Sequence, residues 1–186
     1  MDNRYVKIFA SGSKAPLKAT PGHFATNHAH INYYLDMTTL KTRLSEAQEV
    51  AKHLAERFLF DKVVDTIVCL EGTQVIGAYL AEELTRAGVL STNAHKTIYV
   101  ITPEYNSNSQ MVFRENILPM VHGKNVVILT AVVTTGLSLN KSIEAIQYYG
   151  GKLQSAAAVF STLDELNGCP ITSIYSPEDV TDYIYY

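Results

Sequence analysis

VVILTAVVTTG occupies residues 126–136, and the prediction of the fold starts from this stretch. An unbroken apolar run ends there in a Thr-Thr-Gly turn, and residues 137–149 follow with apolar side chains at helical spacing. This order is typical of a buried parallel strand that leads directly into a helix. The backbone N–H groups at such a helix N-terminus favour an anion such as phosphate.

The turn offers hydroxyl groups as well as backbone donors, from Thr134, Thr135 and Ser138. Together with the N–H groups around Gly136, these hydroxyls form a nest of the kind that holds anions. Glycine at this position lets the backbone approach a ligand closely. From spacing alone, an ordinary tight turn with N-capping explains the same residues equally well, so both interpretations stay open.

The sequence on either side of this stretch alternates between strand and helix patterns. Apolar runs at 63–70 and 97–101 predict buried strands, and the apolar spacing of 74–87 predicts a helix between them. Further strands are expected at 153–160 and 171–175. Because a strand–helix–strand order predicts a right-handed parallel crossover, we expect an α/β protein with a Rossmann-like, open, mostly parallel sheet flanked by helices.

The N-terminal part lacks this alternation. Residues 1–22 are punctuated by glycines and prolines and are expected to be irregular, apart from a short edge strand around Val6 and Ile8. Three histidines follow, His23, His28 and His30. They fit a metal site, a loop that lines a polar pocket, or solvated side chains. Since no cysteine or paired carboxylate lies beside them at ligand spacing, no metal site is predicted.

Composition and charge limit the class of protein. With 186 residues, 47% hydrophobic and 18% charged, the chain is expected to form one globular domain. A net charge of −3 argues against a nucleic-acid partner, and no stretch approaches the ~18 apolar residues of a membrane span. The first residues lack the apolar core of a signal peptide, and Cys69 and Cys169 form no C-x-x-C motif. We therefore expect a cytoplasmic protein with two reduced thiols.

Three loops are expected to meet beyond the carboxyl ends of the parallel strands, where ligands of open α/β sheets bind. They are residues 71–73, 102–118 and 130–137. Residues 102–109 are polar and lack apolar periodicity, which predicts a long exposed loop. Such loops are often functional lids or disordered segments.

The motif V-V-I-L-x-x-V-V-T-T-G-x-S-L at 126–139 resembles the phosphoribosyl diphosphate (PRPP) motif of type I phosphoribosyltransferases. In that family an apolar strand is followed by two acids, two apolar residues and T-T-G-x-S. Residues 30–37, H-I-N-Y-Y-L-D-M, are similar to the early H-S-x-Y-Y-x-D stretch of orotate phosphoribosyltransferases. Residues 63–84 resemble their strand and loop before the helix behind the diphosphate. The resemblance covers most of residues 20–176 and is closest to the orotate enzymes.

The resemblance implies an architecture and a set of contacts. Residues 1–40 would form a small N-terminal hood on a core of residues 41–186, in one compact domain overall. The 5′-phosphate of the ribose would lie on the turn, at Thr134, Thr135, Gly136, Leu137 and Ser138. The other parts of the ligand would face three further groups: Glu71, Gly72 and Thr73 at the diphosphate, Thr130 and Ala131 at the ribose, and His30 and Tyr34 at the base.

The resemblance also implies an activity and an assembly. The ligand would be a phosphoribosyl compound or a nucleotide, and the reaction would transfer ribose 5-phosphate from PRPP to a pyrimidine base such as orotate. This reaction belongs to pyrimidine nucleotide biosynthesis. The loop from Thr102 would be the lid, which in this family often reaches into a neighbouring subunit, and a homodimer is therefore implied.

Two features depart from the family pattern. Thr130 and Ala131 stand where the family keeps two acids that hold the ribose hydroxyls directly or through Mg²⁺, so Mg²⁺ is a doubtful cofactor. Residues 102–106 also lack the cations of the family's lid. Since a preorganised donor can stabilise a transition state by ~3–4 kcal/mol, these losses predict weak transfer.

Three functions therefore stay open. The first is an orotate phosphoribosyltransferase-like enzyme. The second is a catalytically impaired regulatory protein that binds a nucleotide or ribose 5-phosphate. The third is an enzyme with a different substrate, whose changed active site uses His28 or His30. The sequence assigns no catalytic residue.

Overall fold

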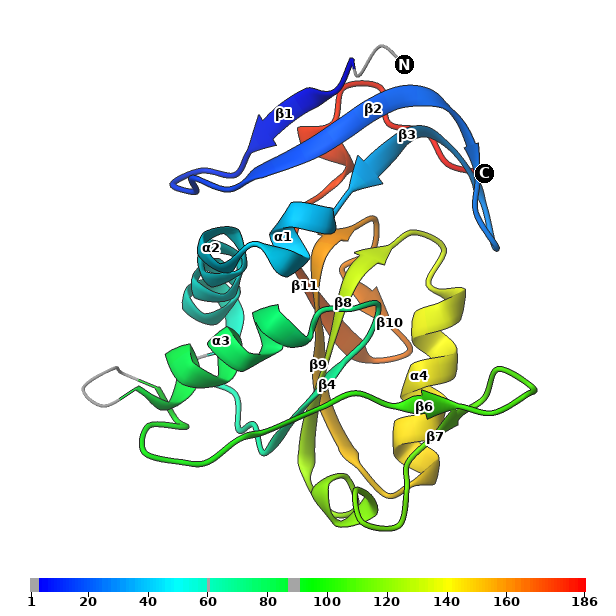
Figure 1. Ribbon diagram of the computed structural model, residues 1–186. Helices are drawn as coiled ribbons and strands as arrows, with labels where there is room; N and C mark the ends of the chain where they lie inside the picture. Colours follow the sequence, from blue (N-terminus) through cyan, green and yellow to red (C-terminus); the bar gives the residue numbers. More distant parts are fainter. Residues whose placement is uncertain (1–3, 60, 87–90) are drawn as a thin grey trace.

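The apolar run of the sequence forms β8 (Asn125–Val133), near the centre of a six-stranded sheet. The computed structural model describes residues 4–59, 61–86 and 91–186 (Figure 1). The sheet has the order β10–β11–β9–β8–β4–β5, in which β10 is antiparallel to β11 and the other neighbours are parallel. The remaining strands are β4 (Thr66–Cys69), β5 (Tyr99–Ile101), β9 (Lys152–Ser161), β10 (Glu165–Leu166) and β11 (Cys169–Tyr175).

β8 is buried on both faces, which explains its unbroken apolar run. Val127 and Leu129 belong to the core cluster that includes residues of α2 (Leu44–Leu54) and α3 (Gln74–Thr85). Val126 and Ile128 belong to a second cluster, with residues of α4 (Leu137–Tyr148). Figure 1 shows α2 and α3 on one side of the sheet and α4 on the other. The predicted α/β fold with an open, mostly parallel sheet is confirmed.

Shorter helical segments complete the core: α1 (Thr38–Thr42), a π-helical turn (Ala55–Leu59) and two 3₁₀ turns (Leu118–Met120 and Pro177–Asp179). The helix predicted at 74–87 begins at Gln74 and ends at Thr85. Its predicted last residue, Ala87, lies outside the described residues. None of the helices in the described ranges has the length and apolar character needed to cross a membrane.

A second sheet precedes the core and corrects the prediction that residues 1–22 are irregular apart from one edge strand. β1 (Val6–Phe9), β2 (Pro16–Ala25) and β3 (His30–Asp36) pair antiparallel in that order, and we call them the N-terminal sheet. Two prolines stand where strands tolerate them, because Pro16 is the first residue of β2 and Pro21 adjoins a register shift in the pairing with β3. The glycines and prolines therefore mark a bulged strand.

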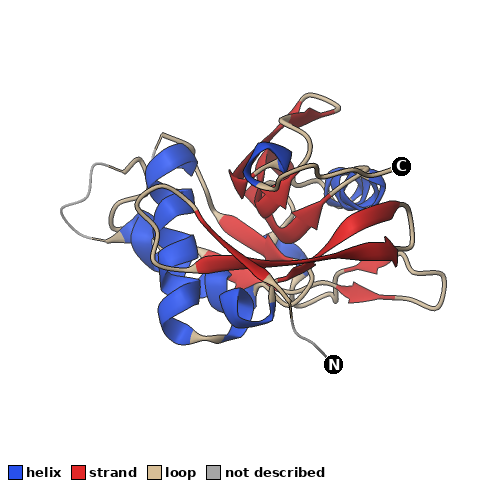
Figure 2. Cartoon of the chain, turned by 90° about the horizontal axis from the view of Figure 1, so that it is seen from above, coloured by secondary structure: helices blue, strands red, loops and turns tan. Residues whose placement is uncertain are grey.

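The N-terminal sheet lies across one end of the core, as Figures 1 and 2 show from two directions. The last residues of the chain return to it, since Ile31 bridges Tyr185 and the His30 N–H donates to the Tyr186 carbonyl at 2.7 Å. Both ends of the chain therefore contribute to this layer. The hood boundary after residue 40 stays a prediction.

The stretch predicted as a long exposed loop is partly structured, which corrects that prediction. β6 (Glu104–Tyr105) and β7 (Met111–Val112) form a two-stranded antiparallel hairpin. The Asn106 side-chain oxygen accepts hydrogen bonds from the N–H groups of Asn108 and Gln110, at 2.9 and 3.0 Å, and so supports the turn. Side-chain hydrogen bonding of this kind replaces apolar periodicity, which is why the pattern of the sequence did not predict the hairpin.

Asp65 ties together the segments that lead into β4, β5 and β8. Its carboxylate accepts hydrogen bonds from Lys96 Nζ at 2.8 Å and from the backbone and side-chain nitrogens of Asn125 at 2.8 and 2.7 Å. Burial alone would raise the pKa of Asp65, but these hydrogen bonds outweigh it and hold the pKa below its ordinary value. A carboxyl with a lowered folded pKa stabilises the protein above its unfolded pKa, and this stability is lost as the pH falls.

We therefore expect Asp65→Asn to lower the free energy of unfolding at pH 7 by about 1–3 kcal/mol, the range of hydrogen bonds to charged groups. The loss should be smaller at pH 3, because the unfolded carboxyl takes up a proton at a higher pH than the folded one and the stability from the carboxylate charge begins to disappear there. Urea titrations at the two pH values measure it, with exposed Asp61→Asn as the matched control. An equal loss at both pH values would contradict the role assigned to the carboxylate charge.

Candidate functional site

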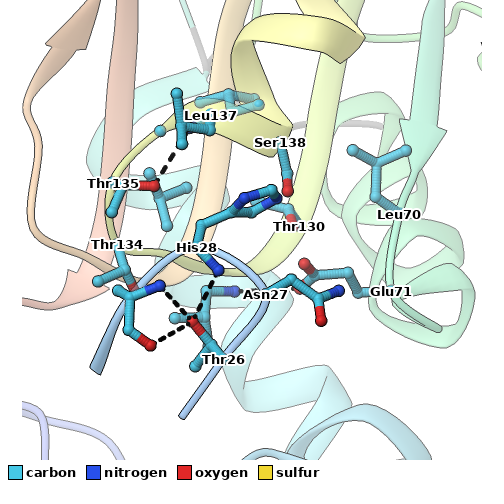
Figure 3. Close-up of a pocket in the computed structure, with 15 residues that line it drawn as sticks. Thr26, Asn27, His28, Leu70, Glu71, Thr130, Thr134, Thr135, Leu137 and Ser138 are labelled. Carbon is cyan, nitrogen blue, oxygen red and sulfur yellow. Dashed lines mark hydrogen bonds between the residues drawn. The ribbon is translucent and has the colours of Figure 1, made fainter. Parts of the chain in front are cut away.

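A cavity of about 240 Å³ lies beyond the carboxyl ends of β4 and β8 (Figure 3). It is lined by the turn between β2 and β3 (residues 26–29), the end of β4 (residues 70–71), and Thr130 with residues 132–139. Its volume falls below the ~300–1,000 Å³ of sites for drug-sized ligands. A small phosphorylated group suits a cavity of this size.

All five residues predicted to hold phosphate line this cavity: Thr134, Thr135, Gly136, Leu137 and Ser138. Gly136 is the N-cap of α4, a helix of 12 residues, so the first N–H groups of α4 lack intrahelical partners. Thr135 Oγ1 accepts a hydrogen bond from Leu137 N at 3.4 Å. The Thr134 carbonyl accepts one from the Thr162 hydroxyl, which ties the turn to the segment after β9. The turn that lines the cavity is thus held in place by the segment after β9.

Gly136 is required by the backbone itself. Its φ of +82° lies in the left-handed region, which side chains rarely adopt. A Cβ atom here would also lie 3.0 Å from Leu163 Cδ1 and 3.2 Å from Leu166 Cδ2. The sequence suggested that glycine lets the backbone approach a ligand closely. The structure adds two further reasons for glycine, the left-handed φ and the contact with the two leucines.

The turn between β2 and β3 presents His28 to the cavity. Thr26 Oγ1 holds this turn, since it accepts from the N–H groups of His28 at 3.3 Å and Ala29 at 2.9 Å. Figure 3 shows the His28 ring directed toward Ser138 and Thr130. Among the residues that line the cavity, His28 carries the only basic side chain. Of the three interpretations of the histidines, the loop that lines a polar pocket describes His28.

Glu71 brings a carboxylate to the same cavity. Its φ of +56° is unusual for a residue with a side chain, and strain of this kind is common at functional sites. Glu71 Oε2 accepts a hydrogen bond from Val132 N at 3.4 Å, and its carbonyl accepts one from Lys41 Nζ at 2.8 Å. Lys41 comes from α1, and no feature of the sequence marked it as part of this region.

The other residues of the predicted diphosphate loop have different positions. Gly72 has a φ of +75°, and an added Cβ would lie 3.8 Å from Lys41 Nζ. Thr73 is fully buried, and its hydroxyl donates to the carbonyls of Leu70 at 2.7 Å and Leu129 at 3.1 Å. Neither residue is among those that line the cavity, whereas Glu71 is.

Thr130 and Ala131 point to opposite sides of β8, because successive side chains of a strand alternate. Thr130 lines the cavity, although it is only 3% exposed. Ala131, also 3% exposed, belongs to the core cluster that contains residues of α2 and α3. Of the two positions where the resembling family keeps acids, one therefore faces the cavity and the other packs into the core.

The two residues predicted for a base pocket lie on β3, outside the cavity lining. His30 Nδ1 is 3.2 Å from His23 Nε2, and the His30 ring stacks on Tyr186 with centroids 5.7 Å apart. Tyr34 is exposed and lies beside Phe24. In the part of the chain that the structure describes, no three His, Cys, Asp or Glu side chains are grouped so as to hold a metal ion.

Both cysteines are free and buried. Burial raises the pKa of Cys69 to about 12 and that of Cys169 to about 11. Since the thiolate is the nucleophilic form, neither thiol is suited to nucleophilic catalysis at neutral pH.

Three solved structures illustrate the proteins that share this fold. The orotate phosphoribosyltransferase of Mycobacterium tuberculosis H37Rv matches with a TM-score of 0.59 and 16% identity, over 89% of this chain and 93% of that chain. The UMP synthase of Leishmania donovani matches with a TM-score of 0.62 and 18% identity, over 86% of this chain and 34% of that chain. The adenine phosphoribosyltransferase of Trypanosoma brucei was solved with AMP, pyrophosphate and ribose-5-phosphate. It matches with a TM-score of 0.59 and 12% identity, over 89% of this chain and 78% of that chain.

These identities establish the fold and no more. The chain has the type I phosphoribosyltransferase fold, which confirms the predicted resemblance at that level. No protein-family model matches the sequence. No curated protein matches it either.

Proposed function

We propose that this chain, on a phosphoribosyltransferase fold, binds the 5-phosphate of a phosphoribosyl compound in the cavity at the start of α4. One observation carries the proposal: the predicted phosphate turn lines a cavity, with left-handed Gly136 at the N-cap of α4 and His28 opposite. Backbone donors at a helix N-terminus and an imidazole are groups that favour phosphate. The ligand is PRPP or a pyrimidine nucleotide.

The remaining lining residues suit the rest of such a ligand. Thr130 offers a hydroxyl for the ribose, and the Glu71 carboxylate can accept hydrogen bonds from ribose hydroxyls. Lys41 lies behind the same loop, on the Glu71 carbonyl, where it adds positive charge near the place proposed for the diphosphate. The proposed base pocket at His30 and Tyr34 rests on the resemblance alone.

Transfer of ribose 5-phosphate to orotate is the reaction to test first, and we expect it to be slow or absent. Thr130, the one of the two positions that lines the cavity, brings no charge to stabilise the positive ribose of the transition state. If such a charge is worth ~3–4 kcal/mol, its absence lowers the rate by more than ~100-fold. Binding depends on the phosphate turn, which is intact. A catalytically impaired protein that binds and senses a nucleotide therefore fits these residues better than an efficient transferase.

The residues that line the cavity could hold Mg²⁺ only together with the diphosphate of a bound ligand. Within the cavity lining, Glu71 supplies the only carboxylate, and Thr130 adds a hydroxyl. Magnesium is commonly bound through one or two carboxylates together with substrate phosphates. When bound, the ion would neutralise diphosphate charge, and Glu71 would be the residue of this chain that holds it.

Calorimetry and a turnover assay on the purified protein test the proposal together. Ribose 5-phosphate, PRPP and orotidine 5′-phosphate should bind, and diphosphate release with PRPP, Mg²⁺ and orotate should be far below the ~1–10³ s⁻¹ of ordinary enzymes. Turnover in that range would reject the sensor in favour of the enzyme. Failure of all three ligands to bind would reject the phosphate site itself.

A homodimer, a cytoplasmic location and a place in pyrimidine nucleotide metabolism belong to the same proposal, and so does the absence of a nucleic-acid partner. They rest on the resemblance and on the composition of the chain. Sedimentation of the purified protein with and without PRPP tests the dimer, and a monomer under both conditions would reject it.

His28 and His30 provide a matched pair of variants. We expect His28→Ala to weaken ribose 5-phosphate binding by ~10-fold, the effect of one charge-assisted hydrogen bond. His30→Ala should leave that affinity unchanged, because His30 is outside the cavity lining. If His30→Ala lowers the affinity for orotidine 5′-phosphate, the result would support the base pocket on β3. A larger loss of ribose 5-phosphate affinity in His30→Ala than in His28→Ala would contradict the assigned phosphate site.

A further inference from the structure

A second cavity, of about 350 Å³, lies where the N-terminal sheet meets the start of α2. We call it the basic groove, and the residues that line it are Lys7, Phe9, Lys14, Pro16, Lys18, Arg43, Ser45 and Glu46. Four of these eight side chains are cationic and one is anionic, although the whole chain has a net charge of −3. The proposed phosphoribosyl site shares no lining residue with this groove.

Two of the lysines are direct neighbours on adjacent strands of the N-terminal sheet. Lys7 on β1 and Lys18 on β2 are directly paired residues of an antiparallel ladder. Directly paired residues lie on the same face, and like charges in this position destabilise a sheet. An anion between the two ammonium groups would turn this repulsion into attraction.

The acids nearby offset only part of this positive charge. Glu46 is 8% exposed, and its carboxylate accepts a hydrogen bond from Thr39 Oγ1 at 3.1 Å and lies 3.8 Å from Arg43 Nη1. Asp36 on β3 is directly paired with Lys18, and hydrogen bonds from Thr38, followed by the charge of Lys18, hold the pKa of Asp36 below its ordinary value. Within the described ranges, neither Lys7 nor Lys14 has a salt-bridge partner. The groove therefore keeps excess positive charge.

An aromatic side chain borders the charged part of the groove. Phe9 follows Lys7 by two residues on β1, so it lies on the same face, opposite Pro16. It is 56% exposed, so its ring is accessible to a ligand. A flat apolar ring beside clustered cations matches the two parts of a nucleotide, since nucleobases stack on aromatic rings and phosphates pair with ammonium groups.

We propose that the basic groove binds a nucleoside polyphosphate, with its phosphates between Lys7, Lys18, Lys14 and Arg43 and its base on Phe9. A compact groove of this volume on a chain of negative net charge favours a small polyanion over nucleic acid, which needs an extended basic surface. The proposal does not depend on the phosphoribosyl function. β2 leads from Lys18 in the groove to Ala25, one residue before the turn that lines the first cavity, so this strand connects the two sites.

Calorimetry with the full chain tests this site, with ATP and inorganic tripolyphosphate as probes. The variant Lys7→Gln/Lys18→Gln should lose ~100-fold in affinity for both probes, because each charge-assisted contact corresponds to roughly tenfold. The matched control Lys52→Gln/Lys152→Gln removes the same charge from exposed positions outside the groove and should bind like the wild type. Phe9→Ala should weaken the binding of ATP and leave the affinity for tripolyphosphate unchanged.

Two further measurements separate this site from general effects. Without ligand, the single variant Lys7→Gln should be as stable as the wild type or more stable, because it removes the repulsion from Lys18 and leaves the pair of Lys18 with Asp36 in place. Saturating ribose 5-phosphate should not displace tripolyphosphate, since the two sites have different lining residues. Equal probe affinity in the groove variant and its control, displacement by ribose 5-phosphate, or tighter binding of a single-stranded oligonucleotide than of ATP would each overturn the proposal.

Discussion

Replacement of Gly136 by valine is expected to abolish binding of ribose 5-phosphate, with a loss of at least ~100-fold in affinity. The φ of +82° costs a residue with a side chain roughly 1–2 kcal/mol, and more when it is β-branched. The added Cβ would also lie 3.0 Å from Leu163 Cδ1 and 3.2 Å from Leu166 Cδ2. The leucine side chains or the turn must shift by a few tenths of an ångström to relieve this contact, in addition to the strain of the φ, and binding groups must stay within about 0.5 Å of their productive positions.

Calorimetry with ribose 5-phosphate and thermal unfolding of the same samples measure this effect. Gly123→Val is the matched control, because Gly123 has a φ of +70° but no atom within 4 Å of an added Cβ. It carries the cost of the left-handed backbone without the contact and lies outside the cavity lining. The control should therefore lose stability and keep its affinity. Unchanged affinity in a folded Gly136→Val variant would place the phosphate site elsewhere.

Restoration of an acid by the substitution Ala131→Asp is expected to destabilise the protein by at least about 3 kcal/mol. Ala131 is 3% exposed and belongs to the core cluster with residues of α2 and α3. Among the described residues no Lys, Arg or His side chain is buried, so we expect the introduced carboxylate to be buried without a partner. Burial of an unpaired charge costs several kcal/mol. Burial would also raise the pKa of the new carboxyl in the folded state, so the loss of stability should shrink as the pH falls through that raised pKa and be smallest below ~4.

Thr130→Asp is the comparison for this variant, because Thr130 faces the cavity. Its loss of stability should be much smaller than that of Ala131→Asp, and it should bind Mg²⁺ in the presence of PRPP more tightly than the wild type does. Urea unfolding at pH 7 and pH 3, together with Mg²⁺ titrations, measures both effects. Equal stability of the two variants would mean that the side chain at position 131 also reaches the cavity.

The central strand and the phosphate turn could be predicted because their signals are contiguous in the chain. The run at 126–133 is apolar at nearly every residue because β8 is covered on both faces, and the turn that follows combines hydroxyls with glycine. The N-terminal sheet gave a weaker signal. β2 contains two prolines and a glycine, and its pairing with β3 shifts register, so it lacks regular alternation. The β6–β7 hairpin depends on side-chain hydrogen bonds of Asn106, which periodicity does not report.

The sequence by itself determined the order of strands and helices and the glycine turn at Gly136, because their signals are contiguous in the chain, and that order predicts a parallel sheet. The tertiary structure decided which side chains meet that turn. It brings His28 from the N-terminal sheet and Glu71 from the end of β4, and it separates Thr130 in the cavity from Ala131 in the core. These assignments depend on how strands distant in the chain pack, and local patterns carry little information about such contacts. The absence of the acid pair found in the resembling family is therefore visible in the sequence, whereas the carboxylate and imidazole that line the cavity become visible only in the folded chain.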